Sequence, residues 1–250
     1  MAKQPATDDH VFFGGDDRLE GILEWPGVGG LVQPGASEAG TAAGGVVIAH
    51  PHPLYGGTMA QPVVYRIAQA CREHGLATLR FNFRGVGESR GTYSGTEEFR
   101  DVDAAAAYLR ERLTGSTGRA EPGTPGGLGR SDQGAPVALA GYSFGSVMAA
   151  MAAAGKEGAA ALALVAFVVG WEDMPPDALE KLVGFRGPVL AVCGDQDELA
   201  PPREVERTLS GLGLDFSLSV VRGADHFFEN SRREVGERVA VFLEEAFARR

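Results

Sequence analysis

Short apolar runs alternate along the chain with longer segments in which apolar residues recur at helical spacing. Apolar runs of about four to eight residues, rich in β-branched side chains, are typical of strands buried on both faces. They predict strands at residues 46–50, 76–83, 136–141, 160–169, 188–194 and 215–221. The helical spacing predicts helices at residues 59–74, 95–113, 144–155, 202–213 and 232–250. This alternation predicts a mostly parallel sheet with helices on both faces.

The first part of the chain has a different pattern. Residues 10–25 (HVFFGG…RLEGILEW) alternate apolar and polar positions with period two, which predicts a pair of antiparallel strands at the sheet edge. With this pair, the predicted sheet has eight strands. In the predicted helix at 95–113, Thr96 is the expected N-cap and acidic residues fall in the first turn.

A chain of 250 residues suits one large α/β domain. We predict a single domain over residues 10–250 and a flexible N-terminus at residues 1–9. Two Gly-rich segments, 26–45 and 114–135, cannot bury enough apolar surface to offset their ordering entropy, so we predict mobile loops. Strand-like runs resume directly after each loop, which argues against a domain boundary there.

Charge and composition narrow the possible functions. With 33 acidic and 23 basic residues the net charge is −10, and an acidic surface repels phosphate backbones, so we expect no nucleic-acid partner. The longest apolar run, 159–170, is shorter than the roughly 20 residues of a membrane span. No signal-peptide pattern opens the chain, so we expect a cytoplasmic protein without membrane contact. Cys71 and Cys193 are expected to be buried apolar residues rather than a disulfide framework.

The pentapeptide GYSFG, residues 141–145, follows a predicted strand and opens a predicted helix. This strand–turn–helix context is typical of a nucleophile elbow, in which a strained turn exposes a serine hydroxyl. Ser143 is therefore the candidate nucleophile. The N–H of Phe144, at the start of the helix, is a candidate donor to an oxyanion.

A serine nucleophile needs a base, and on this fold the order along the chain is serine, acid, histidine. His226 is the only histidine after Ser143, and it lies between the last predicted strand and the last predicted helix. His226 is therefore the candidate base.

The acid is expected after the preceding strand, in VLAVCGDQDELAPP. Asp197 is the preferred candidate because it lies far enough along the loop to turn back toward the histidine. Asp195 is expected to cap the turn, and Glu198 is expected to be solvated. Glu172 and Asp173, one strand earlier, remain an alternative position for the acid.

A second oxyanion donor is expected from the loop HPHPLYGGTM, residues 50–59. Pro51 and Pro53 have no N–H, so the His52 N–H is the best candidate and that of Leu54 the second. We expect the His50 side chain to form hydrogen bonds within this loop.

Four motifs together resemble a known family. HPHPLYGGTM, LRFNFRGVGESRG, AGYSFGS and GADHFF, in this order, are similar to the small bacterial α/β-hydrolase family related to dienelactone hydrolases, over about residues 10 to 248. The resemblance implies an α/β-hydrolase fold and a triad at Ser143, Asp197 and His226. Dienelactone hydrolases proper carry cysteine at the elbow, so their substrate is not implied here.

Three other motifs are weaker. RGVGESRG (84–91) lacks the glycine spacing of a dinucleotide site, and AAAGKEG (152–158) lacks the first glycine of a P-loop. His50 and His52 form an H-x-H pair, as some zinc sites do, but no further His or Cys lies nearby. We therefore expect neither a metal nor a cofactor.

The sequence predicts a serine hydrolase that cleaves a carboxylic ester with a small or short acyl group. A thioesterase or peptidase with the same triad, or a non-catalytic accessory protein of this fold, remains an alternative. Residues 170–187 leave room for a minimal cap with one short helix at most. Candidate pocket residues, each of which could equally belong to the core, are Tyr55, Trp171, Met174, Phe227 and Phe228.

Overall fold

A computed structural model describes residues 9–15, 18–27, 42–115, 135–155, 158–170, 174–175 and 177–250. Within these residues the strands form one eight-stranded sheet in the order β1-β2-β4-β3-β5-β6-β7-β8. The strands are β1 (Asp9–Phe13), β2 (Leu19–Glu24), β3 (Gly45–Ala49), β4 (Ala77–Phe81), β5 (Val137–Tyr142), β6 (Leu162–Val165), β7 (Val189–Gly194) and β8 (Phe216–Val221).

The pairing of the strands agrees with the pattern in the sequence. β1 pairs with β2, and β2 with β4, in antiparallel register, with Phe12 opposite Glu20 and Gly21 opposite Phe81. All other neighbours are parallel. The prediction of a mostly parallel eight-stranded sheet with an antiparallel edge hairpin is confirmed.

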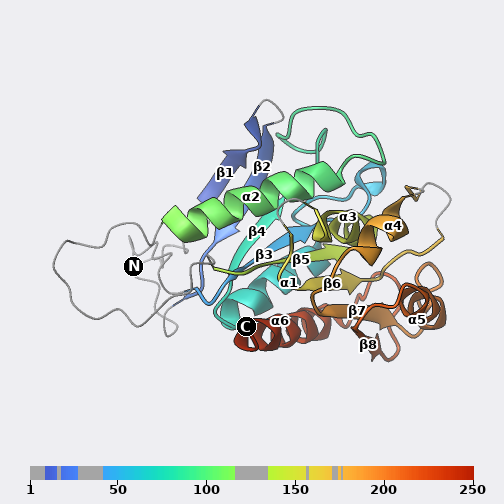
Figure 1. Ribbon diagram of the computed structural model, residues 1–250. Helices are drawn as coiled ribbons and strands as arrows, with labels where there is room; N and C mark the ends of the chain where they lie inside the picture. The colour runs from blue at the N-terminus through green and yellow to red at the C-terminus, as the bar shows by residue number, and fades with distance from the viewer. Residues whose placement is uncertain are drawn as a thin grey trace.

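Helices cover both faces of the sheet (Figure 1). They are α1 (Pro62–Glu73), α2 (Phe99–Gly115), α3 (Phe144–Ala153), α4 (Ala178–Val183), α5 (Pro202–Gly211) and α6 (Arg232–Ala248). The connection from β3 to β4 runs toward the β1 edge of the sheet. The connections from β4 to β5, from β5 to β6 and from β6 to β7 all run toward the β8 edge. Because such connections are right-handed, α1 lies on one face with its neighbour α6, and α2, α3 and α4 lie on the other.

The central strands lie in the core. Every residue of β3, β4, β5, β6 and β7 is buried, whereas β8 at the edge is mostly half-buried. All ten residues of α3 are also buried, so the turn between β5 and α3 joins two elements that are packed within the core. Cys71 and Cys193 are buried free thiols, as predicted.

Two predicted elements have different bounds in the structure. The strand predicted at 160–169 is only β6, because Ala166 adopts φ 48° and ends the extended backbone, while Phe167 stays buried beyond it. The predicted N-cap Thr96 is wrong, since α2 begins at Phe99. Instead the Ser94 hydroxyl accepts the N–H groups of Thr96 and Glu97 ahead of the helix.

Both predicted loops lie largely outside the described residues, at 28–41 and 116–134. Their described ends are ordered, because Ala42 is buried, Gly45 belongs to β3 and Thr114 belongs to α2. Trp171, Glu172 and Asp173 also lie outside the described residues. Between β6 and β7, the described residues contain one helix, the six-residue α4. No helix in the described part of the chain has the length and apolar character needed to cross a membrane.

Candidate active site

Ser143 stands at the turn between β5 and α3. Its backbone has φ 56° and ψ −121°, a region that residues with a side chain rarely adopt. The turn is held on both sides: the Ser143 N–H donates to the Val165 carbonyl at 2.9 Å, and the Ser143 carbonyl accepts the Ser146 N–H at 2.9 Å. This strained conformation presents the side chain at the carboxyl edge of the sheet.

The two glycines of GYSFG are required by close packing. A Cβ at Gly141 would lie 2.1 Å from the Gly145 carbonyl oxygen, and a Cβ at Gly145 would lie 2.4 Å from the Ala49 carbonyl oxygen. Both neighbours are backbone atoms, one in α3 and one in β3, which cannot move aside without disturbing the helix or the sheet. The glycines therefore let the turn and α3 approach β3 closely.

His226 connects Ser143 to a carboxylate. Its Nε2 lies 2.9 Å from Ser143 Oγ, and its Nδ1 lies 2.9 Å from Asp197 Oδ2 and 3.0 Å from Oδ1. Because a carboxylate only accepts, Nδ1 carries the ring proton and Nε2 accepts the serine hydroxyl proton. The structure thus brings together the three residues that the sequence singled out.

Asp197 is fixed by its own loop. Its side chain is buried, and Oδ1 also accepts the N–H groups of Leu199 at 2.9 Å and Ala200 at 2.8 Å. Asp195 instead accepts the Gly223 N–H at 2.7 Å, so it contacts the loop after β8 rather than the backbone of its own turn, and Glu198 is exposed. Asp197 is the carboxylate that His226 contacts in this loop.

Tyr142, which precedes the serine, holds the histidine loop. Its hydroxyl donates to the His226 carbonyl at 2.9 Å. Burial, with the Asp197 carboxylate adding to it, raises the pKa of Tyr142 far above its usual range, so the hydroxyl remains a donor. The sequence analysis missed this contact because it joins positions 84 residues apart.

His50, on the opposite side of the site, has a structural role. The ring is fully buried; Nδ1–H donates to the Pro51 carbonyl at 2.6 Å and Nε2 accepts the Phe83 N–H at 3.1 Å. Burial lowers the pKa of His50 to about 4, so the ring is neutral near pH 7. The predicted hydrogen bond within the loop is confirmed, and the contact with Phe83 joins this loop to the end of β4.

His52 caps η2 (Pro53–Tyr55), the 3-10 turn after β3. Its Nδ1 accepts the Leu54 N–H at 3.2 Å, so the neutral ring carries its proton on Nε2, which lies 2.9 Å from the Tyr93 hydroxyl oxygen. The ring also lies 5.1 Å from the Phe144 ring, centroid to centroid. Because the Leu54 N–H already donates within the turn, it is a weaker candidate for the oxyanion donor than the His52 N–H.

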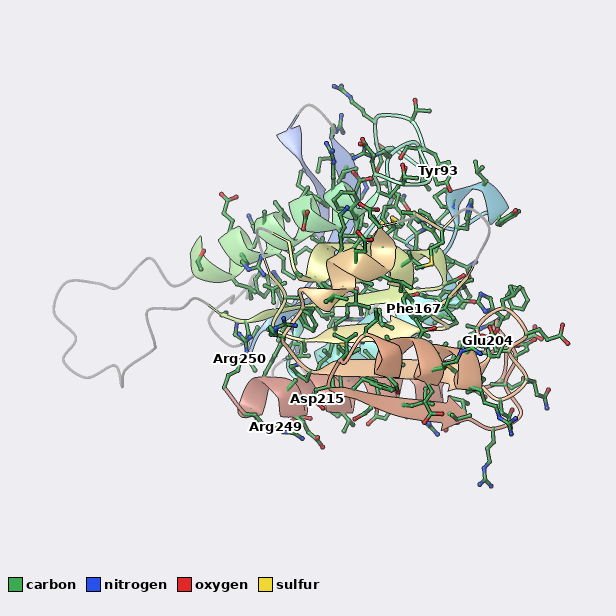
Figure 2. All side chains as sticks on the ribbon, turned by 45° about the vertical axis from the view of Figure 1, so that its right-hand side comes forward. Tyr93, Phe167, Glu204, Asp215, Arg249 and Arg250 are labelled. Carbon is green, nitrogen blue, oxygen red and sulfur yellow. The ribbon has the colours of Figure 1, made fainter. Side chains whose placement is uncertain are left out.

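Tyr93 was not identified from the sequence. It lies in the long loop between β4 and α2 (Figure 2) and is half-buried. Its ring centroid lies 5.2 Å from that of His52 and 5.8 Å from that of Phe144. Tyr93 thereby connects the loop after β4 with the loop after β3 and with the residue that follows Ser143.

The predicted pocket residues have different surroundings. Tyr55 and Phe227 are exposed beside His52 and His226, whereas Met174 is half-buried and packs against the core. Phe228 is fully buried and belongs to the core rather than to a pocket. Trp171 lies outside the described residues.

Potential metal ligands occur in the His50–His52 pair and in a cluster around Glu20, and neither group favours a metal site. Both ring nitrogens of His50 are occupied by backbone groups. A second group, His10, Glu20 and Glu88, brings ligand atoms within 4.8 Å of one another. Glu20, however, already accepts hydrogen bonds from the Asn82 amide and the Glu88 N–H. We assign no metal or cofactor to either group.

A parallel sheet whose carboxyl edge carries a strained serine hydrogen-bonded to a histidine and an aspartate defines the class of α/β hydrolases. A family model described as an alpha/beta hydrolase domain matches residues 43–249, and the chain belongs to this family. It is a hydrolase of the alpha/beta class. The relationship to dienelactone hydrolases remains a resemblance of motifs.

The chain is similar to several known proteins over most of its length. An uncharacterised protein of Rickettsia prowazekii is 25% identical over 208 residues, which are 79% of this chain and 77% of the relative. An alpha-beta serine hydrolase homologue from Coxiella burnetii is 30% identical with a TM-score of 0.74, covering 96% of this chain and 100% of the other. A Xanthomonas campestris structure, an a/b serine hydrolase without lid, shares the fold at 24% identity and a TM-score of 0.72, covering 100% and 97%.

Proposed function

We propose that the protein is a serine hydrolase that cleaves carboxylic esters through an acyl-enzyme on Ser143. The observation that carries this proposal is the continuous row of hydrogen bonds from Ser143 Oγ through His226 to the buried Asp197. A serine hydroxyl is a weak nucleophile near pH 7, and this row provides the base that it lacks.

The proposed reaction has two halves. As Ser143 Oγ attacks the ester carbonyl, its proton passes to His226 Nε2, and Asp197 stabilises the resulting imidazolium. The C–O bond then breaks, and His226 returns the proton to the leaving alkoxide as the acyl-enzyme forms. In the second half, a water molecule gives a proton to His226 and attacks the acyl carbonyl. The acid is released and the Ser143 hydroxyl is restored.

Two backbone N–H groups are proposed to stabilise the oxyanion. Phe144 is the first residue of α3, so its N–H lies at the positive end of the helix dipole, next to the nucleophile. The His52 N–H is proposed as the second donor. The ring contact between His52 and Phe144, at 5.1 Å, supports this because it brings the loop after β3 against the start of α3. Removing one such donor costs roughly 10²–10³ in kcat in enzymes of this type.

The test is labelling of the folded protein with a fluorophosphonate, which reacts only with an activated serine. We expect one label per chain and its loss in Ser143→Ala, together with a loss of esterase activity on the order of 10⁴ or more. Ser210→Ala, an exposed serine on α5, is the matched control and should label normally. Absence of labelling in the wild-type protein would favour the non-catalytic alternative.

The reaction class is tested separately by comparing kcat/KM for an ester, a thioester and an aminoacyl amide with the same acyl group. We expect the ester to be preferred over the amide, because its alkoxide leaves more readily. A preference for the thioester or the amide would instead support the thioesterase or the peptidase.

A further inference from the structure

Four apolar side chains stand out from the surface of the described residues. The most exposed large apolar residues are Tyr55 at 83%, Leu54 at 71%, Phe227 at 62% and Leu199 at 58%. All four lie in the loops at the carboxyl edge of the sheet that also carry His52, His226 and Asp197. We call these four residues the apolar rim. Exposed apolar groups gathered at one place mark a binding surface more often than single ones do.

Each member of the apolar rim lies next to a residue of the site. The Tyr55 ring centroid is 4.7 Å from that of His52, and the Phe227 ring meets the His226 ring edge-on at 5.7 Å. Leu54 follows His52 by two positions, as Leu199 follows Asp197. The rim therefore has members on both sides of the serine, on the loop after β3 and on the loops after β7 and β8.

The backbone of the rim is held by side chains of the same loops. The Leu54 N–H donates to His52 Nδ1, the Leu199 N–H to Asp197 Oδ1 and the Phe227 N–H to Asp225 Oδ1. These bonds fix where three of the four apolar side chains leave the backbone. A surface that is already ordered loses little conformational entropy when it binds a ligand.

Packing of the fold does not explain the rim. The turn η2 buries none of its residues, although two of its three side chains are large and apolar. In the histidine loop, Phe228 fills the core at φ 50°, while its neighbour Phe227 is directed outward. Phe228 therefore contributes to the core, whereas Phe227 stays exposed beside His226.

The charges around the rim have one predominant sign. The loop 50–59 carries no Asp, Glu, Lys or Arg. In the loops that carry Leu199 and Phe227, the exposed charged residues are four acidic ones and one basic one: Asp195, Glu198, Asp225, Glu229 and Arg222. A ligand that bears negative charge near these loops would be repelled, whereas a hydrocarbon chain would not.

From these observations we infer that the apolar rim binds the hydrocarbon chain of an uncharged, medium-chain ester whose carbonyl is held at Ser143. This inference rests on the proposed esterase function and specifies its substrate class. A chain that extends from Ser143 over the rim removes rim surface from water, and each methylene group that leaves water fully is worth about fourfold in binding. Half burial gives about twofold for each methylene.

The first experiment compares kcat/KM for 4-nitrophenyl acetate, butyrate and octanoate, all below their critical micelle concentrations. We expect octanoate to exceed acetate by at least about tenfold. Equal values with an active, labelled enzyme would overturn the inference and leave the esterase proposal standing. In a second series above the critical micelle concentration, a gain that is absent from the first series would also overturn the inference, because the occupant would then be a lipid surface.

The second experiment removes rim surface. Phe227→Ser and Leu54→Ser should each lower the ratio of octanoate to acetate kcat/KM by about threefold to tenfold, and the double variant should lower it further. Val241→Ser, an exposed valine on α6 away from these loops, is the matched control and should keep the wild-type ratio. Fluorophosphonate labelling reports that each variant is folded. An unchanged ratio in the double variant would overturn the inference.

The third experiment tests the charge. The mono-4-nitrophenyl ester of octanedioic acid has the octanoate chain length but ends in a carboxylate. Its kcat/KM should be at least about tenfold below that of the octanoate ester, because the charged end must approach Glu198, Asp225 or Glu229. Equal rates for the two esters would overturn the part of the inference that places the end of the chain at Leu199 and Phe227, beside the acidic residues.

Discussion

Two histidine-bearing loops flank Ser143, and the same residue type has opposite properties in them. His226 has the Asp197 carboxylate on Nδ1 and a serine hydroxyl on Nε2. His50 has the Pro51 carbonyl on Nδ1 and the Phe83 N–H on Nε2. Both rings are buried or nearly so, so burial alone does not distinguish them.

The difference lies in the partners. If His226 gains a proton, Nε2–H can donate to the serine or leaving-group oxygen while the carboxylate stabilises the positive charge. If His50 gains a proton, its Nε2–H would face the Phe83 N–H, while Nδ1 contacts the Pro51 carbonyl, which carries no charge to stabilise the imidazolium. A carboxylate on Nδ1 therefore allows a loop histidine to act as a base, and two backbone groups make it a structural connector.

The largest effect should come from removing the Asp197 carboxylate, which is the partner that distinguishes His226 from His50. In Asp197→Asn, the amide can present its N–H to Nδ1, which favours the tautomer with the proton on Nε2 and removes the acceptor for Ser143. We expect kcat to fall on the order of 10⁴ while the fold is retained. Single-turnover ester hydrolysis and circular dichroism measure the two properties.

Asp195→Asn is the matched control, because this carboxylate contacts the Gly223 N–H rather than a histidine. It should keep kcat within about threefold, since an amide oxygen can still accept that bond. Equal losses in the two variants would show that the loop as a whole, and not the carboxylate on His226, determines activity.

The residues of the His226 side could be predicted from the sequence because each depends on local pattern and order. Gly141 and Gly145 surround a serine at a strand–helix junction, and Asp197 and His226 follow the last two predicted strands in the order that the fold requires. Parallel strands bring their carboxyl ends to one edge, so order along the chain predicts proximity in space.

The other side could not be predicted in the same way. The side-chain role of His52 depends on Tyr93, 41 residues away in a loop without periodicity, and the sequence suggested only the His52 backbone N–H. The predicted strand at 160–169 is too long because an apolar run indicates burial and not strand pairing. Burial continues through Phe167, although strand pairing ends at Val165.

A smaller effect is expected on the free energy of unfolding, which should depend on pH through the buried His50 ring. The unfolded chain binds a proton at His50 near pKa 6.5, while the folded ring does so only near 4. Protons therefore favour unfolding between pH 6.5 and 4, and the contribution of His50 is fully retained above that window. Over the whole window it amounts to roughly 3 kcal/mol.

Urea unfolding at several pH values, for wild type and His50→Asn, measures this contribution. The variant should be less stable at pH 7.5 by about 1–3 kcal/mol, because the shorter amide cannot reach both the Phe83 N–H and the Pro51 carbonyl and leaves one of them unpaired. The difference between the two proteins should shrink as the pH falls. His74→Asn is a control of opposite sign, since Glu244 and Glu237 raise the pKa of His74 and its stabilisation is lost as pH rises. A pH-independent difference for His50→Asn would contradict a buried neutral ring.

The smallest effect should come from the contact that the sequence did not reveal. Tyr93→Phe keeps the ring against His52 and Phe144 but removes the oxygen that the His52 Nε2–H reaches at 2.9 Å. His52 then loses a hydrogen bond that orients its ring, which is worth about 1 kcal/mol, or about fivefold in rate. Because the proposed His52 N–H acts on the oxyanion rather than on the ground-state ester, the loss should fall on kcat, with KM changed by less than about twofold. Tyr65→Phe, on the exposed surface of α1, is the control. A loss confined to KM would instead show that Tyr93 contributes to ground-state binding of the substrate. It would contradict a role for Tyr93 in orienting His52.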